Sequence, residues 1–331
     1  MEESLNWGII GPGNIAGEFV KDLKLIQEFP QRIVAVLSHD LAEATEFAEK
    51  ENAKGYDNIL EFLQNEDLNL VYIATPHPVH YRDVILCLEH KIPVLCEKPL
   101  GMNARQVKEM TELSVKNNTF LMEGMWIRFL PSIHKVVELV AQNKIGDIIH
   151  VKSDLCYVAP KDESNRFFNP GLGGGSLLDL GVYSVFLSLL LLGKPHAIKA
   201  FARLSDKRID ENCVAVLEYA DQSYYLLQSS IVTQTENNAI IYGEKGKIII
   251  KSQWNEKPAG IEVIFYDGKQ ESYPCEWEGR GFQFEIREVF SCIRNGKIFS
   301  DKMDHQFSMD MAELMDEIRE RTGIHYPTDI M

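Results

Sequence analysis

The sequence predicts a two-domain protein, in which a doubly wound parallel α/β sheet precedes an α+β domain with a large, mostly antiparallel sheet. The chain has 331 residues, which is long for a single hydrophobic core. In the first part, short apolar strands alternate with helical patterns, as a parallel sheet requires. From His196 to Cys275, short strands follow one another with tight turns between them, which is typical of an antiparallel sheet. We place the boundary between residues 124 and 125.

Composition excludes several classes of protein. The apolar fraction of 45% and the charged fraction of 25% are ordinary for a globular protein, and the net charge of −15 disfavours nucleic acid and anionic membranes as partners. The acidic stretch from Glu43 to Glu51 is interpreted as a solvated helix face. The six cysteines have spacings that suit neither zinc nor a disulfide framework, so we expect reduced thiols, no metal and a cytoplasmic location. The start of the chain lacks a basic signal region, and the apolar stretch Leu177–Leu192 contains Asp179 and is short for a membrane span.

A glycine-rich turn follows the first predicted strand, Leu5–Ile10. It reads Gly11-Pro-Gly13-Asn14-Ile15-Ala and leads into a helical pattern that reaches about Ile26. The first glycine allows a tight turn, the second lets a pyrophosphate approach the backbone, and the start of the helix faces the phosphates. This context predicts a dinucleotide-binding Rossmann domain over residues 1–124, with Gly11, Gly13, Asn14 and Ile15 as contacts; a glycine-rich turn without a ligand is the alternative.

The second predicted strand, Arg32–Leu37, ends in Ser38 and His39. NAD-binding sites usually place an acid here, to bind the ribose 2′-hydroxyl. A serine and an imidazole suit a 2′-phosphate better, so NADP is the preferred cofactor and NAD the alternative; His39 could equally be an idle surface residue. Asp40 is read as the cap of the next helix, Leu41–Glu51.

Two later strands, Leu70–Ala74 and Ile92–Leu95, also end in polar residues. The carboxyl ends of parallel strands share one edge of a sheet, where such folds bind their ligands. Lys98 follows the second of these strands, and burying a lysine costs desolvation energy, so it needs a partner or a catalytic role. A surface turn with an ion pair is an equal alternative. The bond between Lys98 and Pro99 is a candidate for a cis peptide bond. The expected cofactor contacts at these ends are Thr75, Pro76, His77, His80, Glu97 and Lys98.

The second half adds one chemically unusual helix, predicted over Ser176–Leu192 after a long loop, Ala159–Gly175. Asp179 and Tyr183 are four residues apart, so they share one face of an otherwise apolar helix and need partners. A buried tyrosine capped by an acid remains the alternative to a catalytic pair. The remaining strands are predicted at Ala197–Leu204, Cys213–Tyr219, Ser223–Ile231, Ala239–Gly243, Lys247–Lys251, Gly260–Tyr266 and Glu271–Pro274, and two last helices at Gly281–Asn295 and Gln306–Gly323.

Four motifs together resemble the Gfo/Idh/MocA oxidoreductase family, and within it the branch of the dimeric dihydrodiol and NADP-dependent D-xylose dehydrogenases. They are Gly11-x-Gly13-Asn14-Ile15-Ala16, Thr75-Pro76-x-x-x-His80, Glu97-Lys98-Pro99-Leu100 and Glu123-Gly-Met-Trp126-Ile-Arg128-Phe129. The resemblance implies an NAD(P)-dependent dehydrogenase that transfers hydride between nicotinamide and a carbinol carbon of a sugar, polyol or cyclic trans-diol.

The resemblance also implies roles for single residues. Tyr183 would transfer the proton, Lys98 would be its electrostatic partner, and Asp179 would orient Tyr183 or the substrate. An ammonium near a phenol stabilises the phenolate, which suits a general base. Trp126, Arg128 and Phe129 would border the substrate, although Arg128 could instead be a structural ion-pair partner, and Phe282 is a weaker candidate.

Residues 125–331 would bind the substrate and form a homodimer through their sheet, and their C-terminal helices could pack back on the first domain. Two alternatives stay open: a non-catalytic dinucleotide-binding regulator, and a dehydrogenase or reductase of another substrate class, such as an inositol, an amino sugar or an imine.

Overall fold

The computed structural model describes residues 4–160 and 165–330 and divides the chain into two compact units. The first unit comprises Met1–Trp126 and Glu278–Met309, and the second comprises Ile127–Trp277 and Asp310–Met331. The later stretch in the first unit carries a helix that continues its core. Residues 161–164 of the predicted loop lie outside the described residues.

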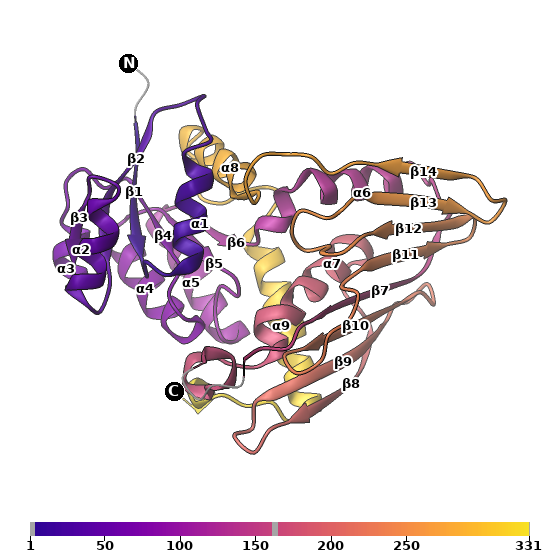
Figure 1. The fold of residues 1–331 in the computed structure, drawn as a ribbon. Coiled ribbons are helices and arrows are strands. Elements are labelled where there is room, and N and C mark those ends of the chain that lie inside the picture. Colours follow the sequence, from indigo (N-terminus) through magenta and orange to yellow (C-terminus); the bar gives the residue numbers. More distant parts are fainter. Residues whose placement is uncertain (1–3, 161–164, 331) are drawn as a thin grey trace. The chain divides into compact units, whose positions relative to one another are not determined.

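The first unit contains a six-stranded sheet in the order β3-β2-β1-β4-β5-β6, and all its pairings are parallel. Chain order reverses between β1 and β4, as in a doubly wound sheet. The prediction for this part of the fold is therefore confirmed (Figure 1). The strands are β1 (Leu5–Ile10), β2 (Gln31–Leu37), β3 (Lys54–Tyr56), β4 (Leu70–Ile73), β5 (Val94–Glu97) and β6 (Leu121–Gly124).

Helices of the first unit begin where capping chemistry permits. Asp40 caps α2 by accepting a 2.8 Å hydrogen bond from the Ala42 N–H, and Asn103 caps α5 through the Gln106 N–H at 3.0 Å. The Asp40 cap is the one predicted above from the sequence. Helix α4 begins at His77, and Pro78 supplies the fixed φ that a first helical turn requires. The helices are α1 (Asn14–Leu23), α2 (Leu41–Glu49), α3 (Ile59–Leu63), α4 (His77–Glu89), α5 (Ala104–Asn117) and α8 (Phe282–Arg294).

Helix α8 joins the first unit through a cap from another helix. The Asp22 carboxylate on α1 accepts backbone N–H groups of Arg280, Gly281 and Phe282. These donors lie at the start of α8, where four N–H groups lack partners within the helix. Phe282 then packs edge-on against Phe19 of α1, with ring centroids 5.8 Å apart.

The second unit is built on an eight-stranded sheet in the order β14-β13-β12-β11-β7-β10-β9-β8. Among the described strands of this second sheet, only the central pair β7 and β10 is parallel, so the prediction of a mostly antiparallel sheet is confirmed. The strands are β7 (Ile148–Cys156), β8 (Ala197–Leu204), β9 (Asp210–Glu218), β10 (Tyr224–Ser230), β11 (Ala239–Gly243), β12 (Gly246–Ile250), β13 (Ile261–Phe265) and β14 (Gln270–Tyr273).

The two faces of this sheet differ. Alternate residues such as Val151, Leu217 and Ile241 are buried, and Figure 1 shows α6 (Pro131–Ala141) and α7 (Val182–Leu192) on one side of the strands. Within each strand, the residues that alternate with these buried ones point to the other face and are half-buried or exposed. Phe201 is the most exposed of the large apolar ones, at 72%. Strands that alternate in this way have one face in the core and one open face. Helix α9 (His305–Thr322) contributes Met311, Leu314, Met315 and Ile318 to the core, and these residues recur at helical spacing.

The most apolar helical stretch, Pro170–Leu192, is long and apolar enough to cross a membrane by length and composition. However, 83% of its most apolar window is buried inside the protein, which is the pattern of a central core helix. The predicted single helix over Ser176–Leu192 is divided, because a π-helical turn, η4 (Leu177–Gly181), precedes α7. An i→i+5 turn cannot be distinguished from an α-helical turn in a uniformly apolar sequence.

Candidate active site

The glycine-rich turn has the geometry that a dinucleotide needs. Gly11 has a φ of +84°, and a Cβ there would lie 2.9 Å from the backbone of Ala74 and Thr75. A Cβ on Gly13 would meet nothing within 4 Å, so its backbone is open to a ligand. No described side chain caps α1, which leaves the first N–H groups of that helix available for a phosphate. Asn14 and Ile15 form this exposed first turn. These residues fit a pyrophosphate.

At the end of β2, Ser38 is buried, whereas its neighbour His39 is exposed. The Ser38 hydroxyl donates a hydrogen bond to the carboxylate of Glu43, in the first turn of α2. The His39 Nδ1 atom lies 3.4 Å from the same hydroxyl. The interpretation of Glu43 as part of a solvated face is therefore incomplete, because this carboxylate reaches the end of the strand. A carboxylate five residues after a strand-ending serine was the sequence signal that could have revealed it.

At the end of β4, His80 connects two strand ends. Its Nε2 atom lies 2.8 Å from the Thr75 carbonyl oxygen, and its Nδ1 atom lies 2.9 Å from the Pro99 carbonyl oxygen. Burial lowers the pKa of His80, and the two carbonyl oxygens oppose that shift. His80 thus holds Thr75 and Pro99 in place from inside the protein. His77 is also buried, and its ring centroid lies 5.8 Å from that of His80.

At the end of β5, Glu97 and Lys98 are both buried. Tyr72 of β4 donates a 2.6 Å hydrogen bond to Glu97, and burial followed by the Glu97 charge raises the pKa of Tyr72 well above its ordinary value. The peptide bond between Lys98 and Pro99 is cis, as the sequence suggested. A buried ammonium is expensive unless charge or chemistry compensates for it. Lys98 is the residue that the sequence motif predicted to take part in catalysis.

Sequence reasoning assigned no role to two buried acids near this strand end, although one of them, Glu123, begins a quoted motif. Glu123 of β6 accepts a 2.9 Å hydrogen bond from the Leu100 N–H, and burial raises the pKa of Glu123 to about 7. Glu285 of α8 is fully buried, and burial together with the Glu97 charge raises its pKa well above the ordinary value. An acid on the apolar side of a helix, between Phe282 and Ile286, was a signal for Glu285.

The predicted aromatic border is partly assembled within the first unit. Trp126 begins η1 (Trp126–Phe129) and stacks on Phe282, with ring centroids 4.9 Å apart and planes 19° apart. The Arg280 guanidinium lies 6.0 Å from the centre of the Trp126 ring. Phe129 is buried and Arg128 is half-buried. The structure thus brings together Trp126, one of the predicted border residues, and Phe282, the weaker candidate.

In the second unit, Asp179 and Tyr183 are both buried at the start of the apolar helix. Asp179 Oδ1 lies 3.0 Å from the Arg166 guanidinium. Burial, followed by the Asp179 charge, raises the pKa of Tyr157. Arg166 lies over the ring of Phe167, 4.3 Å from its centre. The loop before the helix therefore supplies the countercharge for Asp179.

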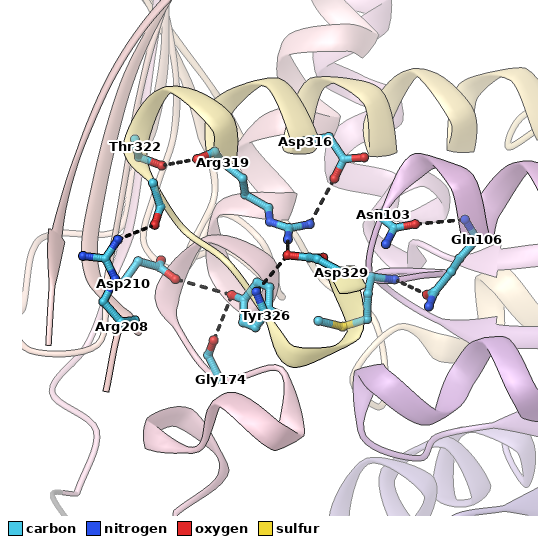
Figure 2. A network of polar contacts seen from close by, with 12 residues as sticks. Asn103, Gln106, Gly174, Arg208, Asp210, Asp316, Arg319, Thr322, Tyr326 and Asp329 are labelled. Atoms are coloured by element: carbon cyan, nitrogen blue, oxygen red, sulfur yellow. Dashed lines mark hydrogen bonds and ion pairs between the residues drawn. The ribbon is translucent and has the colours of Figure 1, made fainter. Parts of the chain in front are cut away.

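A buried carboxylate holds the start of this helix. Asp210 of β9 accepts the Ser176 N–H and hydroxyl, each at 2.9 Å, and the Leu177 N–H at 2.7 Å. Tyr326 donates a 2.9 Å hydrogen bond to the Gly174 carbonyl oxygen, and its hydroxyl lies 3.5 Å from Asp210 (Figure 2). Sequence reasoning missed Asp210, because its partners lie more than 30 residues away along the chain.

The chain matches known families and known proteins along most of its length. Residues 5–125 match the "oxidoreductase family, NAD-binding Rossmann fold" and residues 133–249 match the "GFO/IDH/MocA C-terminal domain". The chain is 34% identical to trans-1,2-dihydrobenzene-1,2-diol dehydrogenase of Xenopus laevis, covering 97% of this chain and 99% of that protein. It is 30% identical to the enzyme of the same name in Homo sapiens, covering 98% and 99%.

Solved structures share the fold. A 3-ketoreductase from Actinomadura kijaniata, in complex with NADP and TDP-benzene, superposes with a TM-score of 0.87 at 22% identity and covers 97% of this chain and 98% of its own. A levoglucosan dehydrogenase, in complex with NADH and levoglucosan, reaches 0.86 at 16% identity with the same coverage. The cofactor is a nicotinamide dinucleotide, NADP or NAD, and the motif-based assignment is confirmed: the chain belongs to the Gfo/Idh/MocA family of NAD-binding oxidoreductases.

Proposed function

We propose that this protein catalyses reversible, NAD(P)-dependent oxidation of a carbinol carbon in a sugar, a polyol or a cyclic trans-diol. The observation that carries the proposal is Lys98, a buried ammonium at the carboxyl end of β5. The same sheet opens with the glycine-rich turn at Gly11 and Gly13, which fits a pyrophosphate. The relatives named trans-1,2-dihydrobenzene-1,2-diol dehydrogenase support the substrate class.

The chain's own residues divide the work as follows. The bound nicotinamide supplies the site for hydride transfer. The Tyr183 hydroxyl takes up or returns the proton of the substrate hydroxyl, and the Lys98 ammonium favours the phenolate form of Tyr183. Asp179, paired with Arg166, orients the substrate or the phenol. Trp126, Arg128 and Phe129 border the substrate, because an aromatic surface suits the face of a sugar ring or a cyclic diol.

The remaining predicted residues, with the exception of the buried His80, contact the cofactor in this proposal. Gly11, Gly13, Asn14 and Ile15 hold the pyrophosphate, and Ser38 and His39 lie at the adenosine ribose. The nicotinamide side is lined by Thr75, Pro76, His77, Glu97 and Lys98. His80 acts through the carbonyl oxygens that it holds, since both its ring nitrogens face backbone.

The test is a substrate panel with NAD and NADP as oxidants. The panel contains aldoses, polyols, cyclic trans-diols, inositols and amino sugars, and it is run with wild type and Tyr183→Phe. We expect turnover of a sugar, polyol or diol, and a loss of about 10²–10⁴-fold in kcat when the phenol is removed. Tyr219→Phe, at another buried tyrosine of the second unit, is the control. Dinucleotide binding without turnover of any substrate would favour a regulator, and unchanged turnover in Tyr183→Phe would remove the phenol from the mechanism.

A homodimer through the open face of the second sheet is part of the proposal. Phe201 of β8 pairs with Val214 of β9 on that face, and both are exposed, as is appropriate for an interface rather than for a solvated sheet. Lys199, Val216, Leu226, Tyr224 and Tyr242 continue the face across the next strands, from the registers of the pairs.

The oligomeric state tests this part. We expect a dimer by light scattering coupled to size exclusion, and a monomer for Phe201→Asp combined with Val214→Asp. Val115→Asp, at a valine of α5 that is 56% exposed in the first unit, is the matched control. A monomeric wild type would contradict the proposal.

The proposal also includes the roles of the two domains and the cellular location. Residues 1–124 carry the dinucleotide-binding site, in a domain that the stretch 278–309 completes, and the remainder of residues 125–331 is the substrate-binding and oligomerisation domain. The protein acts in the cytoplasm, because all six cysteines are unpaired and five of them are buried. Fractionation of cells that express the protein checks the location.

A further inference from the structure

The contact between Ser38 and Glu43 concerns the choice of cofactor. Ser38 directly follows β2 and is buried, and its N–H donates a 3.1 Å hydrogen bond to the Tyr56 carbonyl oxygen of β3. Its hydroxyl donates to the Glu43 carboxylate. Glu43 is exposed apart from this contact, so the hydrogen bond fixes a carboxylate at the surface where β2 ends.

In a doubly wound dinucleotide-binding sheet, this strand end meets the ribose of the adenosine half. A carboxylate there accepts the 2′-hydroxyl of NAD, whereas the 2′-phosphate of NADP requires cationic donors. Solved structures with this fold hold either dinucleotide, since one contains NADP and another NADH. The fold therefore leaves the choice to the residues at this position.

The charges at this strand end favour the hydroxyl. Asp40 and Glu43 are two carboxylates in the first turn region of α2, and His39 is the neighbouring imidazole. The Lys54 ammonium lies over the ring of Tyr56, 4.7 Å from its centre, on the adjacent strand β3. The sequence contains no arginine from residue 33 to residue 81, so the bidentate guanidinium that commonly binds phosphate is missing from this stretch.

We propose that Glu43 is the residue that discriminates between the two cofactors, because its carboxylate accepts the ribose 2′-hydroxyl of NAD and repels the 2′-phosphate of NADP. The Ser38-His39 pair alone favours NADP, and Glu43 reverses that preference. The inference deepens the proposed function and rests on it for the class of cofactor. Ser38 acts as a positioning residue, since its hydroxyl holds the carboxylate.

Binding titrations with NADH and NADPH on the full chain test this proposal. We expect NADH to bind at least about tenfold more tightly, as one extra unfavourable contact between exposed charges implies. Glu43→Gln keeps a hydrogen-bond acceptor for Ser38 and removes the charge, so NADPH affinity should rise by about tenfold while NADH affinity changes by less than about threefold. Glu49→Gln, at an exposed carboxylate later on α2, should leave the ratio of the two affinities unchanged.

The possible results test the role of Glu43 separately from the proposed oxidoreductase function. Tighter binding of NADPH by wild type, or an unchanged ratio in Glu43→Gln, would overturn the assignment of Glu43 and leave the proposed oxidoreductase intact. Failure of both dinucleotides to bind would overturn the proposed function itself. His39→Ala adds an independent arm: if the imidazole decided the choice instead, its removal and not that of the Glu43 charge would change the ratio.

Discussion

The carboxylate of Asp210 accepts two hydrogen bonds from Ser176, one from the backbone N–H and one from the hydroxyl, both at 2.9 Å. A residue of β9 thereby caps the π turn η4 that leads into α7, the helix that carries Tyr183. Helix starts normally obtain their caps from the preceding residue. Here the cap comes from a distant strand, so the position of the helix depends on the sheet beneath it.

Removing this cap is expected to destabilise the protein. Asp210→Ala leaves the two N–H groups and the Ser176 hydroxyl without their carboxylate, at a cost of about 2–3 kcal/mol in the free energy of unfolding. Denaturant titration measures the difference. Asp206→Ala, at an exposed aspartate of the preceding turn, should change it by less than about 0.5 kcal/mol. Equal effects of the two substitutions would show that the cap contributes nothing.

The same carboxylate predicts a pH dependence. Burial raises the pKa of Asp210 to about 6 from 3.8, although the N–H and hydroxyl donors oppose the shift. The folded state therefore binds this proton more tightly than the unfolded state does. Its contribution to stability is fully present below about pH 4 and is lost as the pH rises through about 6.

Asp210→Asn isolates this contribution, because every other group titrates in both proteins. The stability of wild type relative to Asp210→Asn should increase as the pH falls from 7 to 4, by up to about 3 kcal/mol. Denaturant titrations at three pH values measure the difference. A difference that is constant over this range, or that shrinks as the pH falls, would contradict the raised pKa.

A second buried pair, Tyr72 with Glu97, supports the strand end that carries Lys98. Tyr72→Phe removes the 2.6 Å hydrogen bond and leaves a buried carboxylate with one donor fewer, while the stacking on Phe19 at 3.8 Å is preserved. We expect a loss of about 1–3 kcal/mol in the free energy of unfolding. The chain offers a matched control: Tyr81 donates the same type of bond to Glu109 but is only half-buried, so Tyr81→Phe should cost less than about 0.5 kcal/mol. Similar losses in both variants would mean that burial of the pair has no effect.

The parts of the molecule that the sequence revealed are those whose signal is local. Strands β8 and β11 lie at their predicted residues because alternation with period two and flanking turns define a strand without reference to its partners. The turn at Gly11 was recognisable because its conformation and its contact with Ala74 leave no space for a side chain. That requirement makes the position a glycine, which is visible in the sequence. The division of the apolar helix into η4 and α7 was hidden, because both conformations bury the same residues.

Contacts between distant residues were not predictable in this way. Asp210 and Ser176 are separated by 34 positions, and Glu285 lies in α8, far along the chain from Glu97. Glu43 was closer, but its helix shows acids on its exposed side throughout, so composition alone favoured a solvated face. In each case the role of the polar group depends on a partner that only the folded chain brings next to it.

Substitution of Lys98 tests the electrostatic role directly. Lys98→Met keeps the length and apolar stem of the side chain and removes the charge, so we expect kcat to fall by about 10²–10⁴-fold while NAD(P) still binds and the fold is retained. The proposed role of Lys98 in favouring the phenolate of Tyr183 predicts that the residual oxidation requires a higher pH than in wild type. Lys98→Arg, which keeps the charge, should recover part of the rate and of the pH profile.

The control and the contradictory result follow from the same reasoning. Lys108→Met, at an exposed lysine of α5, should leave both the rate and the pH profile unchanged. Full activity of Lys98→Met would exclude any role of the ammonium in the reaction. A reduced rate with an unshifted pH profile would instead separate the two functions: Lys98 would position the substrate or the cofactor, and Tyr183 would act as a base without its help.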